Sequence, residues 1–156
     1  YWTVDALNNY YDQLQGEKYI LYVPKNGHGI KDYPRLLGGL SALYQHATAN
    51  GKAAKDKLPN FTWLHTTKDK THKIAVKAEP APRELTLWTA ESKTRDFRDA
   101  TFVPKKIDLQ AGETIAEAAL PTDGYSAVFV EAQFDRQPYP LPLSTTIKVL
   151  GSAAAE

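Results

Sequence analysis

The residue whose type and setting most suggest chemistry is His28, which lies between Gly27 and Gly29. An apolar, β-branched run ends at Pro24 just before it, and a helical pattern follows it. A histidine that a loop delivers at the carboxyl end of a strand can act as a general base and take a proton from a serine hydroxyl. The flanking glycines would leave space for such a base to reorient. The alternative is an ordinary loop histidine in a glycine turn, and the spacing alone leaves both interpretations open.

A general base of this kind needs a nucleophile to activate. In α/β-hydrolases the nucleophile is a serine on a sharp, glycine-flanked turn between a strand and a helix. None of the five serines of the chain has a glycine two residues away on each side; they are Ser41, Ser92, Ser126, Ser144 and Ser152. We therefore expect this chain alone to be inactive as a hydrolase.

Three other histidines are weaker candidates. His65 and His72, with Asp69 between them, could bracket a metal ion across a hairpin. Zinc sites use three or four ligands in a closed set, and the sequence shows no fourth, so surface histidines are the simpler interpretation. His46 falls on a predicted helix, and we expect it to face solvent. The chain has no cysteine, which excludes disulfides and thiolate metal sites. We expect no metal ion and no cofactor.

Aromatic residues in the second half of the chain could form a carbohydrate platform; they are Trp63, Trp88, Phe97, Phe102 and Tyr125. Aromatic side chains on strands are more often core residues, so we expect these to be buried. Residues 95–99 (RDFRD) alternate charges around one aromatic ring, which indicates a salt-bridged loop. That loop could also dock the later strands onto the first part of the chain.

The composition limits the possible classes of protein. The chain has 156 residues, of which 42% are hydrophobic and 24% charged, as is typical of a globular protein. A net charge of +1 removes the electrostatic case for a nucleic-acid partner. No apolar run of about 18 residues is present, so we expect no membrane span. Methionine is absent and no signal peptide is evident, so we expect Tyr1 to be an internal cut in a longer polypeptide.

The first 52 residues predict a helix, a strand and a second helix. Apolar residues recur at helical spacing from Val4 to Leu14. The apolar run at residues 18–23 is typical of a strand that is buried on both faces of a parallel sheet. Residues 33 to about 50 form the second predicted helix, with a buried stripe of Leu36, Leu37, Leu40, Leu43, Tyr44 and Ala47. We interpret residues 1–52 as the C-terminal segment of an α/β-hydrolase-like domain, which must pack on missing neighbours or on the later strands.

Residues 60–150 change from helical to alternating periodicity. About seven short strands with frequent turn signals and no convincing helix predict an antiparallel, immunoglobulin-like β-sandwich. The domain boundary falls within residues 51–60. Residues 151–156 (GSAAAE) are typical of a flexible tail.

Longer motifs resemble a known family. In the first half they are residues 4–14 (VDALNNYYDQL), 16–24 (GEKYILYVP) and 27–29 (GHG). In the second half they are residues 88–90 (WTA), 94–98 (TRDFR), 124–125 (GY), 129–131 (FVE) and 143–145 (LST). Together these collinear motifs are similar to the PhoPQ-activated pathogenicity-related protein family, over nearly all of residues 1–150.

The resemblance implies an α/β-hydrolase-like parent protein that is secreted or periplasmic. His28 matches the triad histidine of the family, and the family's acid would lie just before Tyr1, outside this chain. The family usually reads Asn-Ala-Gly-His where this chain has Lys25-Asn26-Gly27-His28. That departure keeps the Gly-His pair and puts a lysine near the site.

Two functions follow. In the first, the chain is the C-terminal portion of a secreted serine-type ester or amide hydrolase, supplies His28 and has the upstream half of the hydrolase domain as its partner. In the alternative, the whole protein is a non-catalytic secreted binding or signalling protein that acts through its β-sandwich. The resemblance allows the alternative because it extends to a secreted repressor of proliferation in amoebae, and because a fold does not fix a function.

Overall fold

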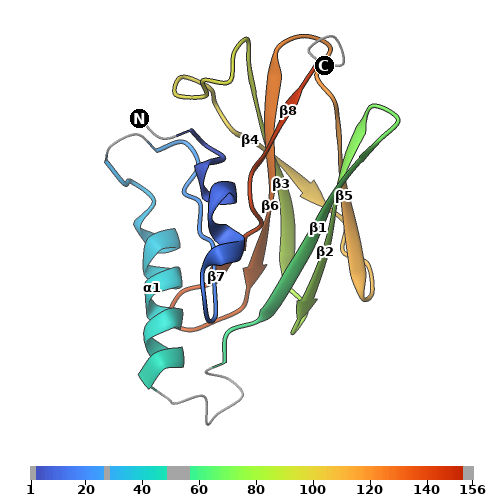
Figure 1. The fold of residues 1–156 in the computed structure, drawn as a ribbon. Helices are drawn as coiled ribbons and strands as arrows, with labels where there is room; N and C mark the ends of the chain where they lie inside the picture. The colour runs from blue at the N-terminus through green and yellow to red at the C-terminus, as the bar shows by residue number, and fades with distance from the viewer. Residues whose placement is uncertain (1–2, 27–28, 49–56, 153–156) are drawn as a thin grey trace.

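The computed structural model describes residues 3–26, 29–48 and 57–152, and this part of the chain is mostly antiparallel β-sheet with one α-helix (Figure 1). That composition is compatible with the predicted β-sandwich. Two short 3-10 helices come first and one α-helix follows: η1 (Ala6–Asn9), η2 (Tyr11–Gln13) and α1 (Tyr33–Thr48). The strands are β1 (Asn60–Lys68), β2 (Thr71–Glu79), β3 (Glu84–Ser92), β4 (Val103–Ile107), β5 (Glu113–Ala119), β6 (Tyr125–Phe134), β7 (Leu141–Ser144) and β8 (Lys148–Gly151).

The strands form two sheets. One has the order β1-β2-β5, and the other has the order β4-β3-β6-β7, with β8 also paired to β6. A shared core joins the two, because side chains of β2 and β5 belong to the same buried cluster as side chains of β3 and β6. Its members include Ile74, Val76, Ala116, Leu85, Leu87, Val128 and Val130. Alternation along each strand therefore places one apolar face of each sheet in the core, as the sequence predicts.

Strand β6 is buried on both faces. Val128 and Val130 point into the core between the sheets, whereas Phe129 belongs to a second buried cluster on the opposite face. In that cluster Phe129 lies opposite Trp88 of β3, and Tyr22 from the N-terminal segment packs against it. The centroids of the Tyr22 and Phe129 rings are 5.2 Å apart in an edge-on arrangement. The N-terminal segment thus covers a sheet face that would otherwise expose aromatic surface to water.

The five candidate platform aromatics belong to the two cores. Trp88 and Phe97 are buried, Phe102 and Tyr125 pack against their cluster, and Trp63 packs against the core between the sheets. The core interpretation is confirmed.

The predicted strand at residues 18–23 is wrong. The segment is extended, but no sheet pairing includes it. Only two hydrogen bonds tie it to β7: the Ser144 N–H donates to the Ile20 carbonyl at 2.8 Å, and the Tyr22 N–H donates to Ser144 Oγ at 3.2 Å. A strand of a parallel sheet needs neighbours along both edges, and no other part of the described chain provides them. The helix predicted from Val4 to Leu14 is likewise replaced by the short η1 and η2.

The predicted second helix is confirmed as α1, but its predicted buried stripe is wrong. Gly38 and Ala42 are its buried residues, and Leu37, Leu40, Leu43 and Tyr44 are exposed. The reason is a close approach: a Cβ at Gly38 would overlap the carbonyl oxygen of Pro140. Small residues allow α1 to lie against the chain at the start of β7, and this contact turns the leucines outward.

The charged loop at residues 95–99 carries the expected ion pairs. Arg98 lies 2.5 Å from Asp96 within the loop. Arg95 Nη2 lies 2.6 Å from Oδ2 of Asp5, just before η1. The loop therefore connects the sheet to the N-terminal segment, as the sequence suggests.

The C-terminal part of the chain contains two strands and continues in regular structure beyond residue 150. The last part of the chain forms two short strands, β7 and β8, which pair with different parts of β6. Gly151 pairs with Tyr125, and the Ser152 N–H donates to the Gly124 carbonyl at 3.0 Å, so regular structure continues beyond residue 150. Residues 153–156 of the expected tail lie outside the described part. Among residues 3–26, 29–48 and 57–152, no helix is long and apolar enough to span a membrane.

The packing of α1 predicts unequal effects of alanine at its two glycines. Gly38→Ala should lower the free energy of unfolding by about 2 kcal/mol, because overlap with a backbone carbonyl forces the helix away from Pro140. Gly39→Ala is the matched control: its Cβ would meet only Cδ2 of Leu21, at 3.0 Å, a side-chain atom that can shift. Urea unfolding of both variants measures the difference, and equal losses would contradict the close packing.

Candidate functional site

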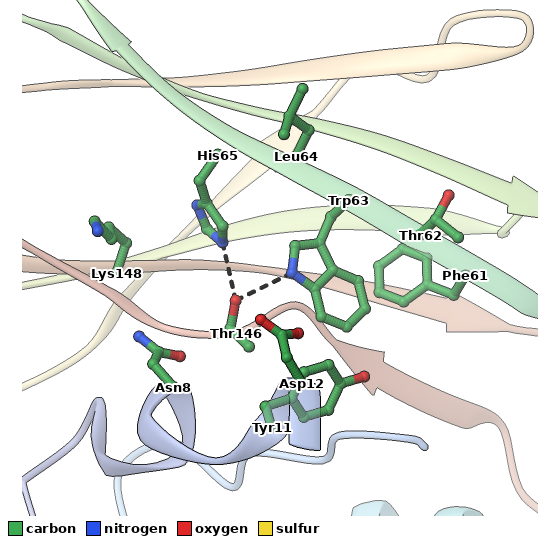
Figure 2. Close-up of a pocket in the computed structure, with 10 residues that line it drawn as sticks. All are labelled: Asn8, Tyr11, Asp12, Phe61, Thr62, Trp63, Leu64, His65, Thr146 and Lys148. Carbon is green, nitrogen blue, oxygen red and sulfur yellow. Dashed lines mark hydrogen bonds between the residues drawn. The ribbon is translucent and has the colours of Figure 1, made fainter. Parts of the chain in front are cut away.

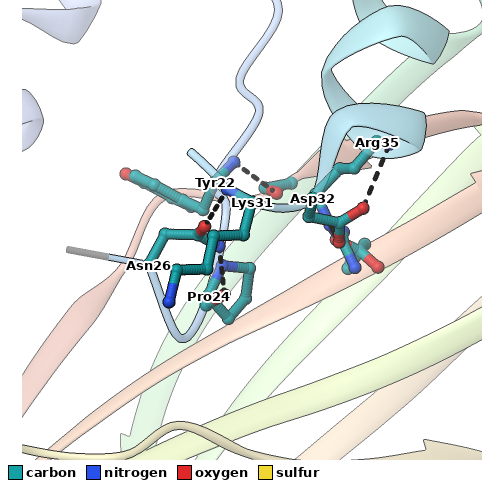
Figure 3. Close-up of polar contacts among 8 residues, drawn as sticks. Tyr22, Pro24, Asn26, Lys31, Asp32 and Arg35 are labelled. Carbon is teal, nitrogen blue, oxygen red and sulfur yellow. Dashed lines mark hydrogen bonds and ion pairs between the residues drawn. The ribbon is translucent and has the colours of Figure 1, made fainter. Parts of the chain in front are cut away.

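His28 lies outside the residues that the structure describes, as does Gly27, but the chain on either side is described. The side chain of Asn26 closes the loop between them (Figure 3). Its Nδ2 donates to the Pro24 carbonyl at 2.9 Å, and its Oδ1 accepts from the Lys31 N–H at 2.7 Å. These bonds hold the two ends of the loop together across residues 27–30. Among the described residues, a Cβ at Gly29 would meet nothing within 4 Å.

The segment that follows the loop is held to β6 by a buried ion pair. Arg35, in the first turn of α1, contacts the carboxylate of Glu131 and lies 3.0 Å from Oδ2 of Asp32. The side chains of Arg35 and Glu131 are only 16% and 9% exposed. The Arg35 guanidinium also lies 6.0 Å from the centroid of the Trp88 ring. Because buried charges need partners, this contact fixes where α1 begins relative to the sheet.

A second candidate site is an open groove of about 510 Å³ between η1–η2 and β1 (Figure 2). Aromatic and polar side chains from four segments line it: Asn8, Tyr11, Asp12, Phe61, Thr62, Trp63, Leu64, His65, Thr146 and Lys148. The centroids of the Tyr11 and Trp63 rings are 5.8 Å apart. The groove therefore has an aromatic wall with charged groups of both signs at its edges.

A chain of hydrogen bonds runs from this groove into β2. Nε1–H of Trp63 donates to Oγ1 of Thr146 at 3.0 Å, and Nε2 of His65 lies 3.1 Å from the same oxygen. Nδ1 of His65 lies 3.0 Å from Nε2 of His72, whose Nδ1 lies 2.7 Å from Oγ1 of Thr67. Burial, followed by the charges of His72 and Lys148, lowers the pKa of His65 to about 4. Burial and Lys148 also lower the pKa of His72. Both rings are thus neutral near pH 7.

The structure brings together only part of the metal site that the sequence allows at His65, Asp69 and His72. His65 and His72 do come together, with ring centroids 5.2 Å apart, but their nitrogens bond to each other. Asp69 lies in the turn between β1 and β2. In the described ranges, no group of three or more histidine and carboxylate side chains could hold a metal ion.

The prediction that His46 faces solvent is wrong. Its side chain is only 20% exposed, and its Nε2 lies 2.7 Å from Oε2 of Glu17.

Sequence reasoning missed three residues that shape these sites. Glu131 carries a signal that could have been used, since it is the one charged residue of strand β6, and a buried charge needs a partner of opposite sign. Asn26 follows a turn residue, Lys25, whose φ of 61° is left-handed, and asparagine is common in such turns. Thr146 lies in an ordinary threonine pair, and nothing in the sequence distinguishes it.

The histidine pair predicts a stability loss in acid. The pKa of His65 falls from its ordinary 6.5 to about 4 on folding, so the unfolded chain binds this proton more readily. The stabilisation is complete above pH 6.5 and is lost as the pH falls towards 4. Between these pH values, the free energy of unfolding of the wild type should fall more than that of a His65→Gln/His72→Gln variant, which keeps every carboxylate. Parallel pH profiles in urea unfolding would contradict this assignment.

The comparisons with known proteins agree with the sequence resemblance. No curated protein and no solved structure matches the chain. The model of one family does match, that of the PhoPQ-activated pathogenicity-related protein, over residues 1–98. The matched region contains the His28 loop, α1, the histidine pair and strands β1 to β3. With more than half of its 156 residues in that match, the chain belongs to the PhoPQ-activated pathogenicity-related protein family.

Proposed function

We propose that this chain is the C-terminal portion of a secreted or periplasmic, α/β-hydrolase-like protein in which His28 is the general base. Residues 1–52 would belong to the hydrolase domain, and residues 60–150 would form an appended immunoglobulin-like β-sandwich. The observation that supports the proposal is that, in a member of this family, Asn26 joins the described stretches of chain on the two sides of residues 27 and 28. The stretch before these residues is bonded to β7, and the helix after them is bonded to β6.

The chemistry would be ester or amide hydrolysis through an acyl-enzyme. A serine of the upstream half attacks the substrate carbonyl while His28 takes its proton, and the imidazolium then returns that proton to the leaving group. A water molecule then attacks the acyl-enzyme while His28 takes its proton, and the histidine returns that proton to the serine. The acid that orients the histidine would also come from the upstream half. This chain would contribute the base and the loop that holds it, and the chain alone would be inactive.

The outward face of α1 supports an upstream partner. Its large apolar side chains are exposed by 41–70% and form one side of the helix: Tyr33, Leu37, Leu40, Leu43 and Tyr44. A contiguous apolar helix face on a surface is typical of an interface, because its exposure to water is unfavourable. In an α/β-hydrolase such a face packs on the central sheet, and the described residues form only antiparallel sheets. We therefore assign the upstream half of the hydrolase domain as the occupant.

This proposal predicts the labelling behaviour of the longer protein. With the nucleophile serine present, a fluorophosphonate probe should label it, and His28→Ala should reduce the labelling rate by about 10³-fold or more, as loss of a triad base does. His65→Gln is the matched control, since it replaces a histidine of β1 outside the loop and should leave the rate unchanged. The rate is read from the intact mass of the labelled protein over time.

Two outcomes would count against His28 as the base. Labelling retained in His28→Ala would mean that another group activates the serine. No labelling of the wild type, in a protein that folds and has a glycine-flanked serine, would favour the alternative of a non-catalytic secreted binding or signalling protein that acts through its β-sandwich.

A further inference from the structure

Strand β1 differs from the other sheet edges in the residues that it carries. Edge strands usually carry prolines or charges that prevent the addition of another strand. The other edges have these devices: Pro104, Lys105 and Lys106 in β4, Glu113 and Glu117 in β5, and Pro142 in β7. β1 reads NFTWLHTTK, with no proline and no formally charged residue before Lys68. Within the described part of the chain, β1 pairs only with β2, so one edge of its backbone has no strand beside it.

The groove beside β1 leaves that edge accessible. Five consecutive residues, 61–65, line the groove. Side chains of a strand alternate between its two faces, so an unbroken run of lining residues places the groove along the strand edge. η2 contacts β1 through Tyr11 and Trp63 and leaves an open volume of about 510 Å³ along the strand.

The outer face of the β1-β2-β5 sheet has a pattern that is symmetric about Leu64. Leu64 pairs with Ala75, which pairs with Ile115, and this apolar row is exposed by 63% at Leu64 and 43% at Ile115. On one side lies the row Thr62, Lys77 and Glu113, and on the other lies the row Thr66, Lys73 and Glu117. Each flanking row has a threonine on β1 followed by a lysine–glutamate ion pair, at 3.2 Å and 2.6 Å.

We propose that β1 pairs with β1 of a second copy of this chain, antiparallel, with the two-fold axis at Leu64. In this register Leu64 lies opposite Leu64 of the second copy, and Thr62 lies opposite Thr66. Lys68 lies opposite Asn60, so no like charges face each other across the interface. The two three-stranded sheets become one six-stranded sheet, with the apolar row continuous through its centre.

The symmetry of the pattern favours a second copy over an unrelated strand. A two-fold contact requires a surface that is complementary to itself, and the threonine and ion-pair rows satisfy this requirement when one is rotated onto the other. Threonine pairs and apolar pairs across antiparallel strands stabilise the sheet. An unrelated extended peptide would satisfy the same backbone groups but would not account for the repeated rows. This contact is independent of the assignment of His28.

The absence of cysteine from the chain allows a direct test of the register. Opposed residues in an antiparallel pair have Cα atoms about 4.5–5.5 Å apart, which is within the range that a disulfide spans. Leu64→Cys in the full chain should therefore form a covalent dimer on mild oxidation, seen by non-reducing electrophoresis. Thr62→Cys/Thr66→Cys should also cross-link, whereas each of these single variants should not. Ile115→Cys is the matched exposed control on the far edge and should stay monomeric.

The unmodified chain supplies the second arm of the test. Sedimentation should give twice the 17.4 kDa of one chain. Leu64→Lys should halve that mass, because it places two ammonium groups opposite each other, and Ile115→Lys should leave it unchanged. A monomeric wild type, a dimer that survives Leu64→Lys, or cross-linking of Ile115→Cys equal to that of Leu64→Cys would overturn the proposal. A monomer whose β1 amides gain hydrogen-exchange protection only on adding a synthetic strand peptide would assign the edge to another polypeptide.

Discussion

The structure depends on the burial of both faces of β6. One face builds the core between the two sheets, and the other would expose Phe129 and Trp88 to water if nothing covered it. Because that second face also contains Glu131, its cover must supply both apolar surface and a positive charge. The N-terminal segment supplies the apolar surface through Tyr22, and α1 supplies the charge through Arg35. Removing either partner of such a pair leaves an unpaired buried charge, at a cost of about 3 kcal/mol or more.

This requirement also fixes the two described stretches of chain that flank residues 27 and 28. The loop joins the segment that packs on Phe129 to the helix that pairs with Glu131, so its two ends are fixed by the same sheet face. Asn26 then closes the loop over a short span.

The strands could be predicted from the sequence because apolar and polar residues alternate where one face of a strand is buried and the other is exposed. In β3, for example, Leu85 and Leu87 lie in the core between the sheets and Trp88 lies in the cluster on the opposite face, as alternation requires. The strand predicted at residues 18–23 failed for a physical reason. An apolar run specifies burial, but a parallel strand also needs neighbouring strands, and the backbone of this segment bonds to β7 at Ser144 alone. The stripe of α1 failed similarly, since the identity of the packed face depends on how closely another segment approaches Gly38.

The candidate sites show the same limit. The position of His28 between glycines could be recognised from residue types, and the pairing of His65 with His72 followed from a hairpin with a short turn. The long-range partners could not be predicted, because Thr146 is 81 residues from its partner His65 and Glu131 is 96 residues from its partner Arg35. Each pair comes together only through the order of the strands. Long-range polar contacts of this kind depend on topology, which local periodicity does not encode.

A double-mutant cycle on Arg35 and Glu131 tests most directly the claim that this buried pair holds the N-terminal part to β6. The free energies of unfolding of Arg35→Met, Glu131→Gln and the double variant would be compared with that of the wild type in urea. The account predicts that each single variant loses about 3 kcal/mol and that the double variant loses little more than either one. Losses that simply add would mean that the two side chains act independently and would contradict it.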